Sequence, residues 1–362
     1  MSDQIPLTLQ TVYAELVERA HLSRMASDFD PGGEFQKKTV KGRDYWYFRS
    51  AMRDGERKWL YVGPDSPQMQ KRIEQHHAEK DGYKQRRAMV SALLQPRTGL
   101  RGPDPRTGQV LRALSDAGVF RMRAVVVGTA AYQTYSGLLG VKLANTNAIT
   151  DDLDLAQFKT ISIAVEDSID VPFLDVLRTV DPGFEPVMET FAPGKACHYA
   201  LGDKYRVDLL TPNRGPDDES PVSLPALQTD AQPLRYLDFL IYREVPAVVL
   251  HGDGIAVNVP SPERYCLHKL LVSRLRQEAN VASQAKARKD LRQAGELLSV
   301  LCDHRPFEIR DLWDELNERG PKWREKASEA VSMLDAETGT TTAREKLEGL
   351  VGDISTLTRR SR

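Results

Sequence analysis

The chain has 362 residues, of which 41 % are hydrophobic and 28 % are charged. This length allows two or three domains with a buried core, and the composition is that of an ordinary globular protein. Lysine and arginine (50) balance aspartate and glutamate (51), so the formal net charge is −1, which excludes a globally basic packaging protein and a strongly acidic tail protein.

The same composition bears on the compartment. We find no apolar run of about 18 residues, so no membrane span is predicted, and the opening MSDQIPLTLQ lacks the features of a signal peptide. The three cysteines, Cys197, Cys266 and Cys302, are far apart and odd in number, which argues against a disulfide framework and favours a reducing cytoplasm. We find no zinc-site spacing and no Walker A, Gly-x-Gly-x-x-Gly or Gly-x-Ser-x-Gly motif. We therefore expect a cytoplasmic protein with no membrane partner.

The N-terminal region combines aromatic and basic residues. Helical spacing of apolar residues predicts a helix within 9–28, and alternating aromatics with turns predict a β-meander within 35–62. The segment from Lys37 to Lys58 contains eight basic residues and three acidic ones. Because basic groups neutralise phosphates and aromatic faces stack on bases, this mixture suits single-stranded nucleic acid. The alternative is a small sheet with its own aromatic core and a solvated charged face. The candidate contacts are Lys37, Lys38, Arg43, Trp46, Arg57 and Lys58.

A charged helix is expected over 65–94, and the prolines and glycines that follow it mark the best candidate domain boundary. Further along, the segments LRYLDFLIY, PAVVLH and IAVNVP within 215–260 are expected to be strands that extend a core sheet. Ser261-Pro262-Glu263 then has the residues typical of a helix start.

Three aspartates occur in apolar, strand-like surroundings. Asp152 and Asp154 would lie on one face of a strand, about 7 Å apart, and would repel each other unless a cation lay between them. Asp208 lies in a second apolar strand, where an uncompensated carboxylate is costly; either a metal or a hydrogen bond at a strand end would offset that cost. Since Mg²⁺ prefers oxygen ligands, three acids on neighbouring strands are suited to a two-metal site.

An apolar strand before Gly128-Thr129 leads into a helix-like stretch, and this turn offers backbone N–H groups and a hydroxyl to a triphosphate. A single Asp-x-Asp is weak evidence, since it also occurs in sugar-nucleotide glycosyltransferases. The ordered set of strand, Gly-Thr, helix, Asp-x-Asp and a later apolar-flanked Asp is more specific.

At these positions the sequence resembles the DNA-polymerase-β-like nucleotidyltransferase superfamily, with Thr129 in place of the usual Ser or Gly. Asp152 follows Gly128 by 24 residues, more than the commonest spacing. Most of the chain is also similar to a bacterial nucleotidyltransferase-fold subfamily related to toxin–antitoxin and phage-defence nucleotidyltransferases. That similarity is carried by KGRDYWYFR, VVVGTAAY, TDDLDLA, YRVDLLTP and GIAVNVPSPERYCLHKLLVSRLR.

The resemblance implies an α+β fold with a polymerase-β-like core and a mixed sheet. The N-terminal helix and basic-aromatic meander with its following helix would occupy 1–103, the catalytic core with its β extension 104–260, and a C-terminal helical lobe 261–362. An acceptor hydroxyl would attack the α-phosphate of an NTP or dNTP with the help of Mg²⁺ or Mn²⁺, and pyrophosphate would leave. The implied catalytic and metal-binding residues are Asp152, Asp154 and Asp208, and the implied nucleotide-binding residues are Gly128, Thr129, Lys269, Arg288 and Lys289.

The basic regions favour a nucleic-acid acceptor, such as a tRNA end or a growing oligonucleotide; a protein hydroxyl and a small molecule are the alternative acceptors. An operon-encoded partner protein and a role in toxin–antitoxin or phage-defence systems are implied by the resemblance alone. The alternatives are a catalytically silent nucleic-acid-binding protein of this fold and, less favoured, an Asp-x-Asp glycosyltransferase. For the basic residues near Lys269 the alternative is a solvated helix face, and the hydroxyl-rich tail 355–362 is either a frayed terminus or a self-modification site.

Overall fold

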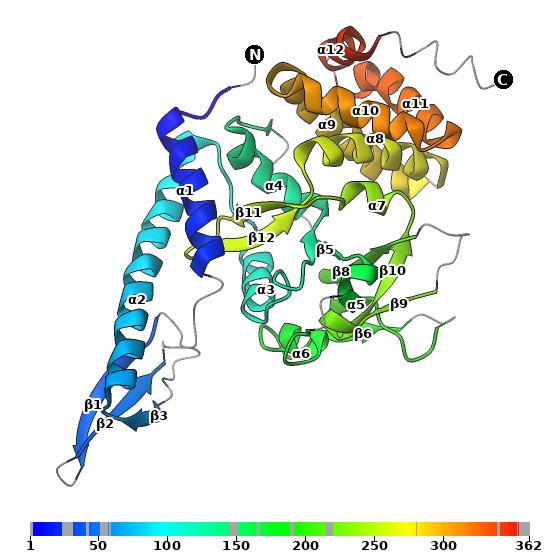
Figure 1. Cartoon of the computed structure of the whole chain (residues 1–362). Helices are drawn as coiled ribbons and strands as arrows, with labels where there is room; N and C mark the ends of the chain where they lie inside the picture. Colours follow the sequence, from blue (N-terminus) through cyan, green and yellow to red (C-terminus); the bar gives the residue numbers. More distant parts are fainter. Residues whose placement is uncertain are drawn as a thin grey trace.

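The computed structural model is a mixed α+β structure with a mixed sheet, as predicted (Figure 1). Residues 3–23, 32–40, 43–50, 57, 59–144, 151–164, 167–188, 192–213, 220–279, 281–338, 341–352 and 354 are described. The candidate residue Lys58, the side chain of Arg43 and the tail 355–362 therefore lie outside the described part of the chain. None of the described helices has both the length and the apolar character that a membrane crossing requires.

The N-terminal residues form an arm that extends away from the rest of the molecule (Figure 1). It consists of an antiparallel sheet of β1 (Glu34–Val40), β2 (Arg43–Arg49) and β3 (Trp59–Pro64) and the long helix α2 (Pro67–Leu93). α1 (Leu7–Ser23), which precedes the arm in the chain, packs against the core. The Ser66 hydroxyl accepts a hydrogen bond from the Met69 N–H at 3.2 Å and so caps α2. The meander and the helix after it are thus where the sequence predicts them.

The C-terminal half of α2 joins the arm to the core. Val90 and Leu93 of α2 pack in an apolar cluster with Leu16 of α1 and Val248 of β11 (Val245–Val249). Beside this cluster, the buried Asp253 carboxylate accepts hydrogen bonds from Arg86 of α2 at 2.6 Å and from Arg112 of α3 (Pro105–Asp116) at 2.5 Å. The cluster and the ion pairs together fix the direction of the arm.

The central sheet has, within the described ranges, the strand order β4-β5-β8-β10-β9, with β7 paired to β8 and β6 to β7. Strands β5, β8 and β10 run parallel, and the other pairs are antiparallel. Side chains alternate between the two faces of each strand. Leu153 of β5 and Val207 of β8 are fully buried in the main core, so the residues next to each of them in its own strand point to the opposite face of the sheet. The strands are β4 (Val125–Val126), β5 (Asp152–Ala156), β6 (Glu185–Val187), β7 (His198–Leu201), β8 (Tyr205–Pro212), β9 (Val222–Leu224) and β10 (Thr229–Leu234).

Helices cover the sheet and form the C-terminal part. α4 (Gly128–Leu139) follows β4, and α5 (Lys159–Ala164), α6 (Phe173–Arg178), α7 (Leu237–Leu240) and two 3₁₀ turns (Pro96–Thr98, Pro225–Leu227) lie around the core. The C-terminal helices are α8 (Pro262–Ala279), α9 (Val281–His304), α10 (Pro306–Glu318), α11 (Pro321–Thr338) and α12 (Thr341–Val351). α3 and α8 begin next to the predicted domain boundaries, and the division into independent domains stays a prediction.

The predicted β extension is wrong in two respects. β11 pairs with β12 (Ile255–Val259) as a separate two-stranded sheet, and the segment LRYLDFLIY continues from the end of β10 into α7. The segment LRYLDFLIY does not continue as a strand because Tyr236 has a positive φ of 65°, which ends the extended conformation of β10 and precedes the first residue of α7.

Candidate functional site

The three predicted aspartates meet on one face of the sheet. In the parallel pairing of β5 and β8, Asp154 is the register partner of Asp208, which places their backbones about 4.8 Å apart. Asp152 precedes Asp154 by two residues and points to the same face. The structure therefore brings together carboxylates from positions 56 residues apart or less in the chain.

Gly128 lies against the Asp154 carboxylate, at the turn between β4 and α4. The Val127 N–H donates to the Asp154 carbonyl at 3.0 Å, and Gly128 has φ +63°. A Cβ at Gly128 would lie 2.3 Å from Asp154 Oδ2. Only glycine combines this backbone conformation with such a close approach, so the Gly of the Gly128-Thr129 pair is required by the carboxylate beside it.

Asp154 is electrostatically uncompensated. Burial, followed by the nearby carboxylates of Asp152 and Asp208, raises its pKa to about 6, against the opposing charges of Lys269 and Arg276. Within the described residues, no hydrogen bond or ion pair reaches this carboxylate. A half-buried carboxylate with like-charged neighbours and no donor is a site where a cation would be stabilising.

The carboxylate of Asp208, in contrast to that of Asp154, accepts hydrogen bonds from neighbouring side chains. Its Oδ1 accepts hydrogen bonds from His198 Nδ1 at 2.8 Å and from Arg206 Nε at 2.5 Å. Burial alone would raise the pKa of Asp208, but these two donors hold it below its usual value. Conversely, burial acts to lower the pKa of His198, and Asp208 outweighs it and raises that pKa to about 9. His198 is therefore a protonated donor at neutral pH.

Sequence reasoning did not single out His198 or Arg206. Arg206 lies two residues before Asp208, so strand periodicity alone places it on the same face. His198 reaches Asp208 because β7 pairs antiparallel with β8 and makes the two residues register partners, and no local pattern in the sequence signals that pairing.

The basic residues Lys286, Arg288 and Lys289 of α9 do not all point the same way. Lys289 Nζ donates to Thr129 Oγ1 at 3.0 Å, and Lys286 Nζ lies 3.9 Å from Asp152 Oδ2. Arg288 is exposed and, one residue before Lys289, points about 100° away around the helix. The structure thus places Lys289 beside Thr129 and Lys286 near Asp152, whereas Arg288 faces elsewhere.

Lys269 is held by an acidic neighbour. Its Nζ lies 2.5 Å from Oδ1 of the buried Asp290, which also pairs with Arg276. Burial opposes the charge of Lys269, but Asp290 keeps its pKa above the usual value. On the same helix, the Tyr265 hydroxyl donates to the Gly128 carbonyl at 2.9 Å. α8 therefore supplies positive charge near Asp154 and fixes the turn, while the Lys269 ammonium itself is paired.

The chemistry of these donors fits a hard divalent cation. Asp154 accepts no hydrogen bond within the described residues, and both bonds to Asp208 end on Oδ1, which leaves Oδ2. Carboxylate oxygens are the ligands that such ions prefer. In the described ranges, no three His, Cys, Asp or Glu side chains are already arranged around one ion position.

The predicted nucleic-acid contacts lie in the arm, apart from the carboxylates. Lys37 pairs with Asp44 and Asp65, each at 2.8 Å, and Trp46 Nε1 donates to Asp65 at 3.0 Å. Lys38 and Arg57 are exposed. Lys37 and Trp46 are thus engaged within the protein, and Lys38 and Arg57 are open to solvent.

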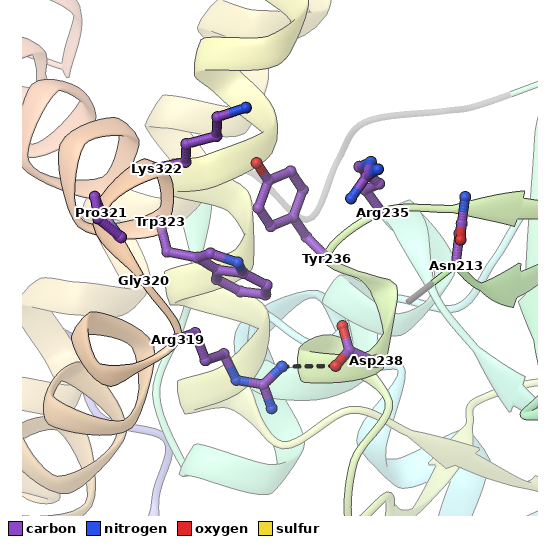
Figure 2. A pocket seen from close by; sticks show the side chains of 9 residues that line it. All are labelled: Asn213, Arg235, Tyr236, Asp238, Arg319, Gly320, Pro321, Lys322 and Trp323. Atoms are coloured by element: carbon purple, nitrogen blue, oxygen red, sulfur yellow. Dashed lines mark hydrogen bonds and ion pairs between the residues drawn. The ribbon is translucent and has the colours of Figure 1, made fainter. Parts of the chain in front are cut away.

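A cavity of about 650 Å³ lies where α7 meets the turn between α10 and α11 (Figure 2). Tyr236 and Trp323 contact each other there with ring centroids 4.5 Å apart, and Arg319 pairs with Asp238 at 2.6 Å. None of the predicted site residues lines this cavity. Its contacts join the C-terminal helices to the core, and it is not part of the candidate site.

Comparison with known proteins places this site in a family. A family model described as "Nucleotidyltransferase" matches residues 105–318, which is more than half of the chain. The protein therefore belongs to this nucleotidyltransferase family. The matched segment includes all three aspartates, the Gly128 turn and both lysines of α9, whereas the N-terminal arm precedes it. Searches of curated proteins and of solved structures gave no match.

Proposed function

We propose that the protein is a nucleotidyltransferase with a polymerase-β-like catalytic core that moves a nucleoside monophosphate from an NTP or dNTP to an acceptor hydroxyl. One observation carries this proposal: Asp154 and Asp208 are register partners on parallel strands, and Gly128 packs directly on the Asp154 carboxylate. An Asp-x-Asp glycosyltransferase has no need of Asp208, so the pairing favours nucleotidyl transfer.

The triphosphate would bind at the start of α4. The backbone N–H groups of its first turn have no side-chain cap at Val127, and such groups bind phosphate oxygens. Thr129 and Lys289, already 3.0 Å apart, would contact the β- and γ-phosphates, and Lys286 would add charge from the same helix face.

Asp152, Asp154 and Asp208 would hold Mg²⁺ or Mn²⁺. Such ions, when bound, lower the pKa of the attacking hydroxyl and neutralise the leaving pyrophosphate. His198 and Arg206 would keep Asp208 ionised and oriented toward the attacking hydroxyl. The remaining catalysis would come from positioning and from fixed positive charge around the phosphates.

Nucleic acid is the acceptor we favour, because the arm offers exposed aromatic and basic side chains. A tRNA end and a growing oligonucleotide both fit this chemistry. A toxin–antitoxin or phage-defence role and an operon-encoded partner stay predictions from the resemblance.

The test is transfer of label from each α-³²P-labelled NTP and dNTP with Mg²⁺ or Mn²⁺, with and without bulk RNA, resolved on denaturing nucleic-acid and protein gels. Wild type should transfer label, and Asp152→Ala/Asp154→Ala and Asp208→Asn should not. Transfer that survives Asp208→Asn would contradict the mechanism. Nucleotide binding without transfer by wild type under every condition would favour the catalytically silent alternative.

A further inference from the structure

The two faces of the arm sheet have different neighbours. On one face, Phe35 and Phe48 pack edge-on against His76 of α2, with ring centroids 5.2 and 5.4 Å apart. Residues of β2 and β3 alternate between faces, and the cross-strand pairs Tyr47–Tyr61 and Arg49–Trp59 lie on the other side. We call this side the open face; its residues are Glu34, Gln36, Lys38, Tyr45, Tyr47, Arg49, Trp59 and Tyr61.

The open face presents aromatic rings together with cations. Trp59 and Tyr61 are 45 % and 56 % exposed. Lys38 Nζ lies 4.5 Å from the ring centroid of Trp59 and 4.9 Å from that of Tyr47. Large aromatics at this exposure in a small sheet mark a binding surface more than a core.

The lysines on the two faces of the arm sheet also differ in their ion pairing. Lys37, on the face toward α2, is neutralised by Asp44 and Asp65. Lys38, its neighbour in sequence, is exposed over the aromatic rings. On the open face, Arg49 pairs with Glu34, so Lys38 is the cation that lies exposed beside the aromatic rings among the described residues of this face.

We propose that the open face binds a single nucleic-acid strand, and that this strand carries the acceptor hydroxyl; the second part rests on the proposed function. Aromatic faces stack on unpaired bases whatever their identity, and lysine and arginine side chains contact the phosphates between them. A duplex keeps its bases paired and offers no such stacking.

The arm sets this surface apart from the carboxylates. α2 contains 27 residues, or about 40 Å of helix, and Arg86, which is anchored to Asp253, lies about 28 Å along the axis from Pro67 next to the sheet. Figure 1 shows the arm sheet at the far end of α2, separated from β5 and β8. The strand would therefore be held several nucleotides away from its reacting end.

The experiment measures binding of a fluorescein-labelled oligouridylate of about 15 nucleotides, within the usual range for single-strand sites, by fluorescence anisotropy. The full chain is compared as wild type, Trp59→Ala/Tyr61→Ala, Lys38→Gln and Leu60→Ala. Leu60 is the matched control, because it lies between Trp59 and Tyr61 on the opposite face and is itself 58 % exposed. Circular dichroism verifies folding of each variant.

We expect Trp59→Ala/Tyr61→Ala to weaken binding at least tenfold, and Leu60→Ala to leave it within twofold. Lys38→Gln should weaken binding and reduce the slope of log K against log salt by about 0.7. Unlabelled duplex RNA should compete poorly. Unchanged binding in both open-face variants, an equal loss in Leu60→Ala, or equal competition by duplex would each overturn the proposal.

Two further measurements separate this surface from catalysis. Asp208→Asn should bind the strand as wild type does, since it lies outside the arm. In the transfer assay, Trp59→Ala/Tyr61→Ala should raise KM for the 15-nucleotide acceptor with little change in kcat and should not affect a dinucleotide acceptor. Binding without any transfer would defeat the proposed function alone, and transfer with no effect of the open-face variants would defeat the surface alone.

Discussion

Asp154 and Asp208 are partners across parallel strands, yet their carboxylates have opposite electrostatic environments. The pKa of Asp154 is raised to about 6 by burial and by its acidic neighbours, whereas His198 and Arg206 hold the pKa of Asp208 below its usual value. Hydrogen bonds thus stabilise the charged form of Asp208, whereas no donor among the described residues reaches the carboxylate of Asp154.

Asp154→Asn should stabilise the metal-free protein at pH 7. A shift from 3.8 to about 6 costs about 3 kcal/mol as an upper value once the group is ionised. Because the folded state binds this proton more tightly, the cost is absent below pH 3.8 and develops as the pH rises through 6. Urea unfolding in EDTA at pH 7 should show the gain, and the gain should shrink toward pH 4.

The control is Asp151→Asn, which changes the exposed neighbouring acid and should alter the free energy of unfolding by about 0.5 kcal/mol or less. Addition of Mg²⁺ should raise the Tm of wild type and not that of Asp154→Asn. Equal stability of wild type and Asp154→Asn at pH 7 would show that Asp154 is not under electrostatic strain.

Gly128→Ala should lower the rate of transfer roughly 100-fold, because its Cβ would displace the Asp154 carboxylate and a misplacement of about 1 Å has a cost of that size. Gly202→Ala is the matched control: Gly202 also has positive φ (+57°), but a Cβ there meets nothing within 4 Å. Both variants should lose about 1–2 kcal/mol of stability from backbone strain. Steady-state transfer kinetics that show equal activity for the two would contradict the contact with Asp154.

Lys286→Ala and Lys289→Ala should each raise KM for the nucleotide about tenfold, because each removes a charge directed at the site. Arg288→Ala, on the same helix, should change KM less than twofold. The comparison is made by measuring the initial rate of transfer against nucleotide concentration. A larger effect of Arg288→Ala than of Lys286→Ala would mean that the other face of α9 contacts the nucleotide.

Asp253→Ala should destabilise the protein by about 3–5 kcal/mol, because it leaves the buried Arg86 without its partner. Asp116→Ala removes another carboxylate near Arg112, but that ion pair is 3.9 Å long and Asp116 is mostly exposed, so the loss should be about 0.5 kcal/mol or less. Urea unfolding measures both. Similar losses in the two variants would show that Asp253 does not anchor the arm.

Local patterns were sufficient for much of the site. The period of two in a strand places Asp152 and Asp154 on one face whatever surrounds them. The apolar strand, Gly128-Thr129 and the following helix are likewise determined by neighbouring residues, and so is the meander with its alternating aromatics. These features depend on backbone geometry over a few residues, which the sequence alone specifies.

Tertiary structure decided the rest. Asp208 lies beside Asp154, and His198 beside Asp208, only through strand register, which depends on how the whole sheet packs. The rotation of α9 against α8 directs Lys286 rather than Arg288 to the acids, and Asp65 engages Lys37 while Lys38 stays open. Periodicity tells which residues share a face, but what that face meets depends on packing between elements distant in the chain.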